Sequence, residues 1–211
     1  MSTDVALTAF ADDFVREDDA VLAARDNADQ YGVEPLSPAT CSTVGVLVAA
    51  LGARTIVEIG TGVGVSGLYV LRAMAPGGVL TTIDVEAEHH KSARATFAAA
   101  GFPPERTRLI TGRALEVLPR LTDAGYDLVL IDGRRSEFAA YMDHALRIVR
   151  PGGMIIMAHA LARGRVADPA QRDVDTTAVR EALRTIRQRD DLRASMLTVG
   201  DGVLTVMIPA Q

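Results

Sequence analysis

Cysteine is nearly absent from this chain, in which Cys41 is the single cysteine among 211 residues. No internal disulfide can form, so a reducing, cytoplasmic compartment is the expected location, and Cys41 is expected to be a small buried residue on a helix. Basic residues are also in deficit, because 27 Asp and Glu side chains outnumber 22 Lys and Arg side chains. Nucleic acids and anionic membranes bind basic surfaces, so we expect neither as a partner.

Long hydrophobic runs are missing as well. The longest one, residues 44–51, is far shorter than the roughly 20 residues that a membrane-spanning helix needs. The N-terminus carries Asp4, Asp12 and Asp13 instead of a basic segment followed by an apolar one, so no secretory signal is expected. Aromatic rings are scarce, with no Trp to wall a pocket, yet hydrophobic residues make up 48% of the chain. That share suffices for one α/β domain with a buried core.

The most specific local pattern lies in residues 55–67. An apolar run broken by Glu58 precedes glycines at positions 60, 62 and 64, and Ser66 opens an apolar helical pattern, so a strand, a tight turn and a helix are predicted. Glycines let the backbone approach a ligand closely, and the N–H groups at a helix start attract electron-rich atoms. The pattern is typical of a nucleotide-type cofactor site, although G-x-G-x-G spacing differs from the dehydrogenase fingerprint G-x-G-x-x-G.

Glu58 lies inside a strand that should be buried. A buried acid needs a partner, and either an amino group of the cofactor or the N–H groups of the glycine turn could serve.

The residues before this pattern are predicted to be helical. Apolar side chains recur at helical spacing over residues 4–24, which predicts one or two amphipathic helices, whereas the polar residues 26–34 predict a loop. An amphipathic helix must cover something, either the active site as a lid or a second subunit. Ser37 followed by Pro38 then predicts a helix start, and this helix ends at Gly52.

Strands and helices alternate along the rest of the chain. Strands are predicted at residues 55–59, 79–83, 107–111, 126–131 and 154–158. Helices are predicted after residue 65 and at residues 86–100, 113–121, 136–149 and 176–188, with a breaker at 151–153 and a polar loop at 162–173. Residues 194–199 and 203–208 predict a closing hairpin. Right-handed crossovers then give a parallel sheet with helices on both faces and at least one antiparallel strand.

Polar residues follow the carboxyl ends of the predicted strands, where ligands of open α/β sheets bind. They are Gly60 and its turn, Asp84, Gly112 with Arg113, Asp132, and His159. Asp84 stands 24 residues after Gly60, where a carboxylate can accept hydrogen bonds from both ribose hydroxyls. The alternative is that Asp84 merely caps the helix that follows it.

These motifs, in this order, carry a resemblance. From about Pro35 to Ile208 the chain resembles the class I S-adenosylmethionine-dependent O-methyltransferases of the catechol/caffeoyl-CoA type. The motifs that carry it are residues 36–38, 57–66, 82–84, 112–119, 126–132, 146–153, 164–169 and 199–202. The resemblance implies a Rossmann-like class I methyltransferase fold, a mostly parallel seven-stranded sheet with a C-terminal antiparallel hairpin. Residues 1–34 are then a helical segment, and residues 35–211 are the methyltransferase domain, in a family that is often homodimeric.

The resemblance also implies which residues hold S-adenosyl-L-methionine and its product S-adenosyl-L-homocysteine. The methionine end would contact Glu58, Gly60, Thr61, Gly62, Ser66 and the backbone of Leu36, with Asp132 nearby. Asp84 and Val85 would hold the ribose. Gly112, Arg113 and Ala114 would border the adenine, with the contact of Arg113 left open because the family usually has an acidic or small residue there.

Catalysis is where the sequence departs from the family. Metal-dependent members bind a divalent cation through an Asp after the fourth strand and an Asp-Asn pair after the fifth. Asp132 matches the first ligand, but Ala158 and His159 replace the pair. One carboxylate and one imidazole make a poor magnesium site, although zinc or manganese could use them. The family's catalytic lysine is also missing, and Arg134 and Arg135 stand nearby; arginine stays protonated, so Arg135 can stabilise an anionic acceptor but cannot act as a base.

We therefore hypothesise that His159, or His159 together with Asp132, is the general base of a metal-independent methyl transfer to a hydroxyl of a small, aromatic acceptor. The alternatives are that His159 is a structural histidine at a strand end, that the protein binds cofactor but has lost catalysis, or that it is a nicotinamide dehydrogenase. The glycine spacing and the hairpin disfavour the last. His89 and His90 are predicted to be solvated.

Overall fold

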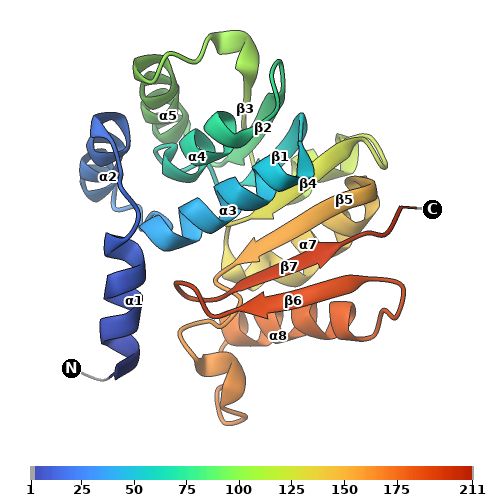
Figure 1. The fold of residues 1–211 in the computed structure, drawn as a ribbon. Helices are drawn as coiled ribbons and strands as arrows, with labels where there is room; N and C mark the ends of the chain where they lie inside the picture. Colours follow the sequence, from blue (N-terminus) through green and yellow to red (C-terminus); the bar gives the residue numbers. More distant parts are fainter. Residues whose placement is uncertain (1–2, 211) are drawn as a thin grey trace.

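The computed structural model describes residues 3–210, which form a seven-stranded sheet covered by helices on both faces (Figure 1). The strands lie in the order β3-β2-β1-β4-β5-β7-β6. β1 to β5 are parallel, and β7 is antiparallel to both of its neighbours. Their bounds are Thr55–Ile59 (β1), Val79–Asp84 (β2), Thr107–Thr111 (β3), Tyr126–Ile131 (β4), Val149–Ala158 (β5), Arg193–Leu197 (β6) and Val203–Met207 (β7). The predicted sheet is confirmed.

Two hydrophobic cores flank the sheet. One lies under helices α2 (Asp19–Tyr31), α3 (Pro38–Leu51), α4 (Val65–Ala73) and α5 (Ala87–Ala99). The other lies under the helices α6 (Ala114–Val117), α7 (Phe138–Ile148) and α8 (Val174–Arg187). Strand β1 contributes side chains to both cores, because successive side chains of a strand point to opposite faces of the sheet. Val57 and Ile59 lie in the second core, and Ile56 lies in the first.

The register of β1 sets the edge at which the site forms. Ile59 pairs with Ile83 of β2 on one side and with Ile131 of β4 on the other. The residues that follow these three partners therefore emerge at one level, beyond the carboxyl ends of the strands. The order of the strands reverses between β1 and β4, which is the position where open α/β sheets form a crevice.

The N-terminal segment differs from its prediction. Residues 26–31, predicted as a loop, belong to α2, which is capped by Asp18 and ends at Gly32 in the left-handed conformation, φ 63°. The polar composition concealed the second half of this helix because, after Val21, its buried residues are only the alanines at positions 24 and 28. α1 (Thr3–Asp13) stands at the edge of the molecule (Figure 1) and contacts the start of α3, where Asp12 accepts a hydrogen bond from the Ala39 N–H at 3.0 Å.

Two other boundaries are corrected. The predicted breaker at residues 151–153 is part of β5, because the N–H of Gly152 donates to the carbonyl of Ile208 at 2.7 Å and so extends the pairing with the C-terminal hairpin. The helix predicted at residues 113–121 shrinks to the single turn of α6 and a 3₁₀ turn, because Pro119 has no N–H to continue the α-helical ladder.

Cys41 is buried on α3, as predicted. No helix within residues 3–210 has the length and hydropathy to cross a bilayer.

Asp127, at the start of β4, links three neighbouring strands at the amino-terminal end of the parallel sheet, opposite the end at which Gly60 and Asp132 lie. One carboxylate oxygen accepts the N–H groups of Arg54 and Thr55 at 2.6 and 2.8 Å, and the other accepts Nε of Arg150 at 2.6 Å. Burial raises the pKa of Asp127, but these donors outweigh it and hold the pKa below its ordinary value.

Replacing this acceptor is expected to destabilise the fold. Asp127→Asn should lower the free energy of unfolding by about 1–3 kcal/mol at neutral pH, because two strand-end donors and a guanidinium lose their carboxylate. The lowered pKa means that the stabilisation is present above 3.8, the ordinary value, and is lost as the pH falls below it. Urea unfolding at neutral and acidic pH should therefore show the difference from wild type shrinking in acid. Asp123→Asn, at an exposed position nearby, is the control; equal stabilities of wild type and Asp127→Asn at neutral pH would contradict the role.

Candidate functional site

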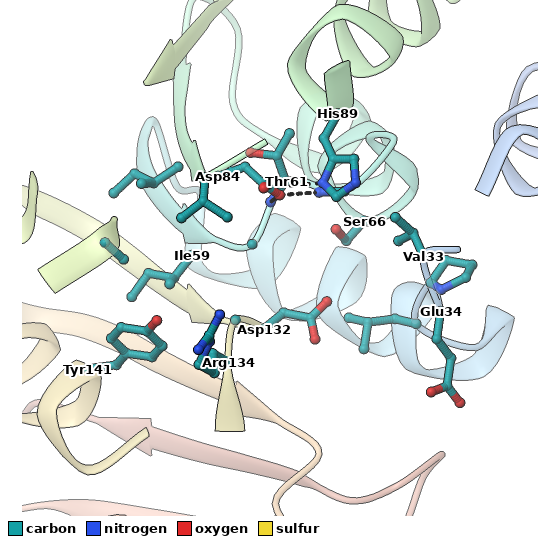
Figure 2. A pocket seen from close by; sticks show the side chains of 18 of the residues that line it. Val33, Glu34, Ile59, Thr61, Ser66, Asp84, His89, Asp132, Arg134 and Tyr141 are labelled. Atoms are coloured by element: carbon teal, nitrogen blue, oxygen red, sulfur yellow. Dashed lines mark hydrogen bonds and ion pairs between the residues drawn. The ribbon is translucent and has the colours of Figure 1, made fainter. Parts of the chain in front are cut away.

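A pocket of about 340 Å³ lies at the carboxyl ends of β1, β2 and β4. Figure 2 shows Thr61, Asp84 and His89 on one side of it, with Asp132 and Arg134 on the opposite side. Most of the residues predicted from the sequence line this pocket: Leu36, Gly60, Thr61, Gly62, Ser66, Asp84, Val85, Gly112, Arg113, Ala114, Asp132, Arg135 and His159. Glu58 does not line it.

The glycine turn bends the chain sharply over the end of the sheet. Gly60, Gly62 and Gly64 all have positive φ values, 98°, 48° and 91°, which glycine adopts without strain. Gly60 is also required sterically, since a Cβ there would collide with the carbonyl oxygen of Asp132. The turn can therefore pass close to the end of β4 and leave room for a ligand above it.

Asp84 holds this turn. One carboxylate oxygen accepts the N–H groups of Thr61 and Gly62 at 3.1 and 2.9 Å. The other accepts the N–H of Glu86 at 3.0 Å and lies 3.2 Å from Nδ1 of His89. Asp84 thus caps the segment that leads into α5, the alternative weighed from the sequence, and it also lines the pocket.

His89 and His90 are not solvated, so that prediction is wrong. His89 lines the pocket, and its ring stands edge-on to Tyr31 of α2 with centroids 6.1 Å apart. His90 is only 5% exposed and bridges two hydroxyls, with Nε2 3.1 Å from Thr61 Oγ1 and Nδ1 2.9 Å from Thr111 Oγ1. The sequence pattern failed because the start of α5 packs beside the turn, a contact that helical periodicity does not encode.

Glu58 lies beneath the pocket in a buried polar layer. Its carboxylate accepts the hydroxyls of Ser66 and Thr82, both at 2.6 Å, and Thr82 contacts the hydroxyl of Thr61 at 2.7 Å. The side chain is fully buried and does not line the pocket, whereas the resemblance implied that Glu58 would contact the methionine end of the cofactor. Burial raises the pKa of Glu58 to about 7, although the two hydroxyl donors favour its ionised form. Its partners in the structure are hydroxyls, and the N–H groups of the glycine turn, one of the two groups expected from the sequence, instead bond to Asp84.

Asp132 and His159 come together at the ends of β4 and β5. His159 Nε2 lies 3.2 Å from Asp132 Oδ1, and each side chain is 15% exposed. On the other edge of the ring, Nδ1 lies 3.2 Å from Oδ2 of Asp201. Burial raises the pKa of Asp132 more than the hydrogen bond with His159 lowers it. Burial is the largest effect on the pKa of His159 and lowers it, but the hydrogen bond and charge of Asp132 together with the charge of Asp201 outweigh burial, and the net direction is upward.

Arginines and carboxylates complete the pocket rim. Arg113 pairs with Glu137 at 2.8 Å, and Glu137 also accepts the hydroxyl of Tyr141 at 2.6 Å. Nη2 of Arg135 lies 3.8 Å from Asp201, while its Nε is buried and makes no hydrogen bond within the described part of the chain. The sequence prediction missed Val33, Glu34, Glu137 and Tyr141 as lining residues. Only the spacing of four between Glu137 and Tyr141 on a predicted helix offered a signal for any of them.

Comparison with known proteins identifies the family. A family model described as O-methyltransferase matches residues 24–208. The chain belongs to the O-methyltransferase family. A Mycobacteroides abscessus relative, provisionally named an O-methyltransferase, is 44% identical over 94% of this chain and 93% of its own length.

Solved structures agree with this assignment. The O-methyltransferase TomG of Streptomyces achromogenes, involved in tomaymycin synthesis and crystallised with SAM, is similar with a TM-score of 0.86 and 29% identity, covering 99% of this chain and 96% of TomG. A Bacillus cereus O-methyltransferase in complex with SAH gives 0.87 and 26%, covering 96% of this chain and 97% of the other. The family and the fold are those that the sequence resemblance implied, and membership excludes the dehydrogenase interpretation.

The donor set of this methyltransferase does not fit a hard divalent cation. Ala158 offers no ligand atom where the metal-dependent members have a carboxylate, and Oδ1 of Asp132 is in contact with Nε2 of His159 at 3.2 Å. Within residues 3–210, no three His, Cys, Asp or Glu side chains are grouped so as to hold a metal ion. Magnesium needs more oxygen ligands than this.

Glu58 yields a test of the buried layer. Because its folded pKa of about 7 exceeds the ordinary 4.5, its contribution to stability is fully present below 4.5 and is lost as the pH rises through about 7. Glu58→Gln has no carboxyl to ionise, so the free energy of unfolding of wild type minus that of the variant should fall over this window. Thermal and urea unfolding at several pH values would measure it, with exposed Glu88→Gln as the control. A difference that does not change with pH would contradict the raised pKa.

Proposed function

We propose that this O-methyltransferase transfers the methyl group of S-adenosyl-L-methionine to a hydroxyl oxygen of a small, aromatic acceptor without a divalent metal. Three observations support it: family membership, the pocket over the glycine turn, and the pair formed by Asp132 and His159 inside that pocket. The pair of Asp132 and His159 is the main support for the metal-free mechanism, because it puts titratable groups where metal-dependent members have a cation.

The pocket suits the cofactor. We assign the methionine end to the turn from Gly60 to Gly62 and to Ser66, the ribose to Asp84 and Val85, and the adenine to the side formed by Gly112, Arg113 and Ala114. Leu36 supplies backbone to the same cavity, and the guanidinium of Arg25 fixes its carbonyl at 2.9 Å. We assign Glu58 an indirect role, in which it orients Ser66 from below.

His89 adds a residue to the ribose side. It lines the pocket beside Asp84, and Tyr31 packs against its ring. We therefore include it with the residues that hold the cofactor.

The bound cofactor supplies an electrophilic methyl group on a positively charged sulfur. The protein must position the acceptor oxygen in line with that methyl group and remove its proton. In this proposal the proton passes to Nε2 of His159 or to the carboxylate of Asp132, the oxygen forms a bond to the methyl carbon, and the bond between carbon and sulfur breaks with its electron pair remaining on sulfur. Arg135, whose Nε has no partner in the described structure, stabilises the anionic oxygen.

Turnover should depend on both members of the pair. His159→Ala and Asp132→Ala are each expected to lower kcat by roughly 10²- to 10⁴-fold, the usual contribution of a general base. Labelled S-adenosyl-L-methionine and a panel of phenolic acceptors would measure it, with and without EDTA, and EDTA should have no effect. His144→Ala, on α7 outside the pocket, is the matched control.

Each part of the proposal can fail separately. Full turnover in both variants would refute the base, and loss of activity in EDTA that Mn²⁺ or Zn²⁺ restores would refute the metal-free mechanism. Tight binding of S-adenosyl-L-homocysteine without turnover on any acceptor would instead indicate a protein that binds the cofactor but has lost catalysis.

We also propose that a second copy of the chain covers α1. Phe10 on this helix is 72% exposed and Phe14, just beyond it, is 81% exposed, and Val5 and Leu7 are exposed as well. Several large exposed apolar side chains on one short segment are typical of an interface, and a two-fold axis lets this segment contact its own copy.

Sedimentation should report this association. Wild type is expected to be a dimer, and the double variant Phe10→Ser/Phe14→Ser a monomer, because the apolar contact is lost. Val174→Ser changes an equally exposed apolar residue on α8 and should stay dimeric. A monomeric wild type would exclude the dimer.

A further inference from the structure

The turn between β6 and β7 is wedged against two other parts of the molecule. Gly200 and Gly202 have positive φ values of 56° and 83°. A Cβ on Gly200 would collide with the Thr40 hydroxyl at the start of α3, and one on Gly202 would collide with the Leu161 side chain. The turn, residues 199–202, is therefore seated closely between α3 and the segment that follows β5, and Asp201 lies at its centre.

The segment after β5 adopts a backbone that is unusual for its residues. His159, Ala162 and Arg163 have positive φ values of 56°, 46° and 57°, a region that residues other than glycine seldom occupy. Such conformations cost free energy and persist only when surrounding contacts enforce them.

Asp201 and its neighbour supply those contacts. The N–H of Leu161 donates to the carbonyl of Asp201 at 2.9 Å, and the N–H of Ala160 donates to the carbonyl of Gly202 at 3.0 Å. The N–H of Arg163 donates to Oδ1 of the Asp201 side chain. One residue of the hairpin turn thus binds the strained segment through both its backbone and its carboxylate.

The second carboxylate oxygen of Asp201 faces the ring of His159. Oδ2 lies 3.2 Å from Nδ1, on the ring edge away from Asp132. The contact with Asp201 has hydrogen-bond geometry, whereas the contact of Nε2 with Asp132 is an ion-pair contact, so Asp201 favours a proton on Nδ1 and fixes the plane of the ring. Nε2 is then held toward Asp132 and the pocket. Nη2 of Arg135 lies 3.8 Å from the same oxygen.

We infer that Asp201 is a positioning residue for His159, which selects its tautomer and aims Nε2 into the acceptor side of the pocket. The inference rests on the proposed role of His159 as base. It places the C-terminal hairpin in the catalytic apparatus as a third element beside the ends of β4 and β5, although Asp201 itself does not line the pocket.

The expected kinetic result is a loss of kcat that depends on His159. Asp201→Ala should lower kcat by about 10- to 100-fold, the usual effect of removing a residue that orients a functional imidazole. The dissociation constant of S-adenosyl-L-homocysteine should stay unchanged, because Asp201 is outside the cofactor side of the pocket. In a His159→Ala background the same substitution should cause no further loss. Asp201→Asn, which keeps an acceptor oxygen for the Arg163 N–H, should fall between wild type and Asp201→Ala.

A spectroscopic measurement separates this inference from the proposed function. Nitrogen-15 NMR of the His159 ring should report a protonated Nδ1 in wild type and a changed signal in Asp201→Ala, whatever the turnover. The exposed Asp191→Ala is the control and should leave both kcat and the signal unchanged. Full turnover in His159→Ala would refute the proposed base alone. An unchanged ring signal in Asp201→Ala, or an equal fold-loss of kcat with and without His159, would overturn the positioning role.

Discussion

Parallel pairing of β1 with both β2 and β4 is the constraint on which the site depends. It places Ile59 level with Ile83 and Ile131, so that the next residue of each strand emerges at the same edge of the sheet. The sharp turn at Gly60 is possible only because no side chain there competes with the end of β4. A slip of one residue in either pairing would turn every side chain of that strand to the other face and separate the turn from its partners.

Beneath this edge, the protein buries polar groups and satisfies them. Glu58, Thr82 and Thr61 form a chain of hydrogen bonds that His90 closes on the other side. An unpaired buried acid would cost several kcal/mol, whereas a fully bonded layer can hold the floor of the pocket rigid. The turn is therefore braced twice, by this layer below and by the Asp84 carboxylate at its side.

The end of the pocket formed by Asp132 and His159 is organised differently, through strained backbone and charge. His159 occupies a left-handed conformation at the end of β5, where it meets Asp132 from β4 and Asp201 from the hairpin. One carboxylate therefore lies on each side of the His159 imidazole, and these charged groups lie close together at this end of the pocket. In the mechanism that we propose, imidazole and guanidinium groups of the chain take the place of the cation that metal-dependent members use.

The amino-acid sequence by itself determined the alternation of strands and helices, the glycine turn, and the positions of Asp84, Asp132 and His159 at strand ends. These features are local, because apolar periodicity and glycine spacing mark where each strand stops, and parallel topology then brings the ends together. The tertiary structure alone decided that Glu58 bonds to hydroxyls, that His89 and His90 pack beside the turn, and that Asp201 reaches His159. Those contacts join residues far apart in the chain through the packing of α5 and the seating of the hairpin, and no local pattern encodes such packing.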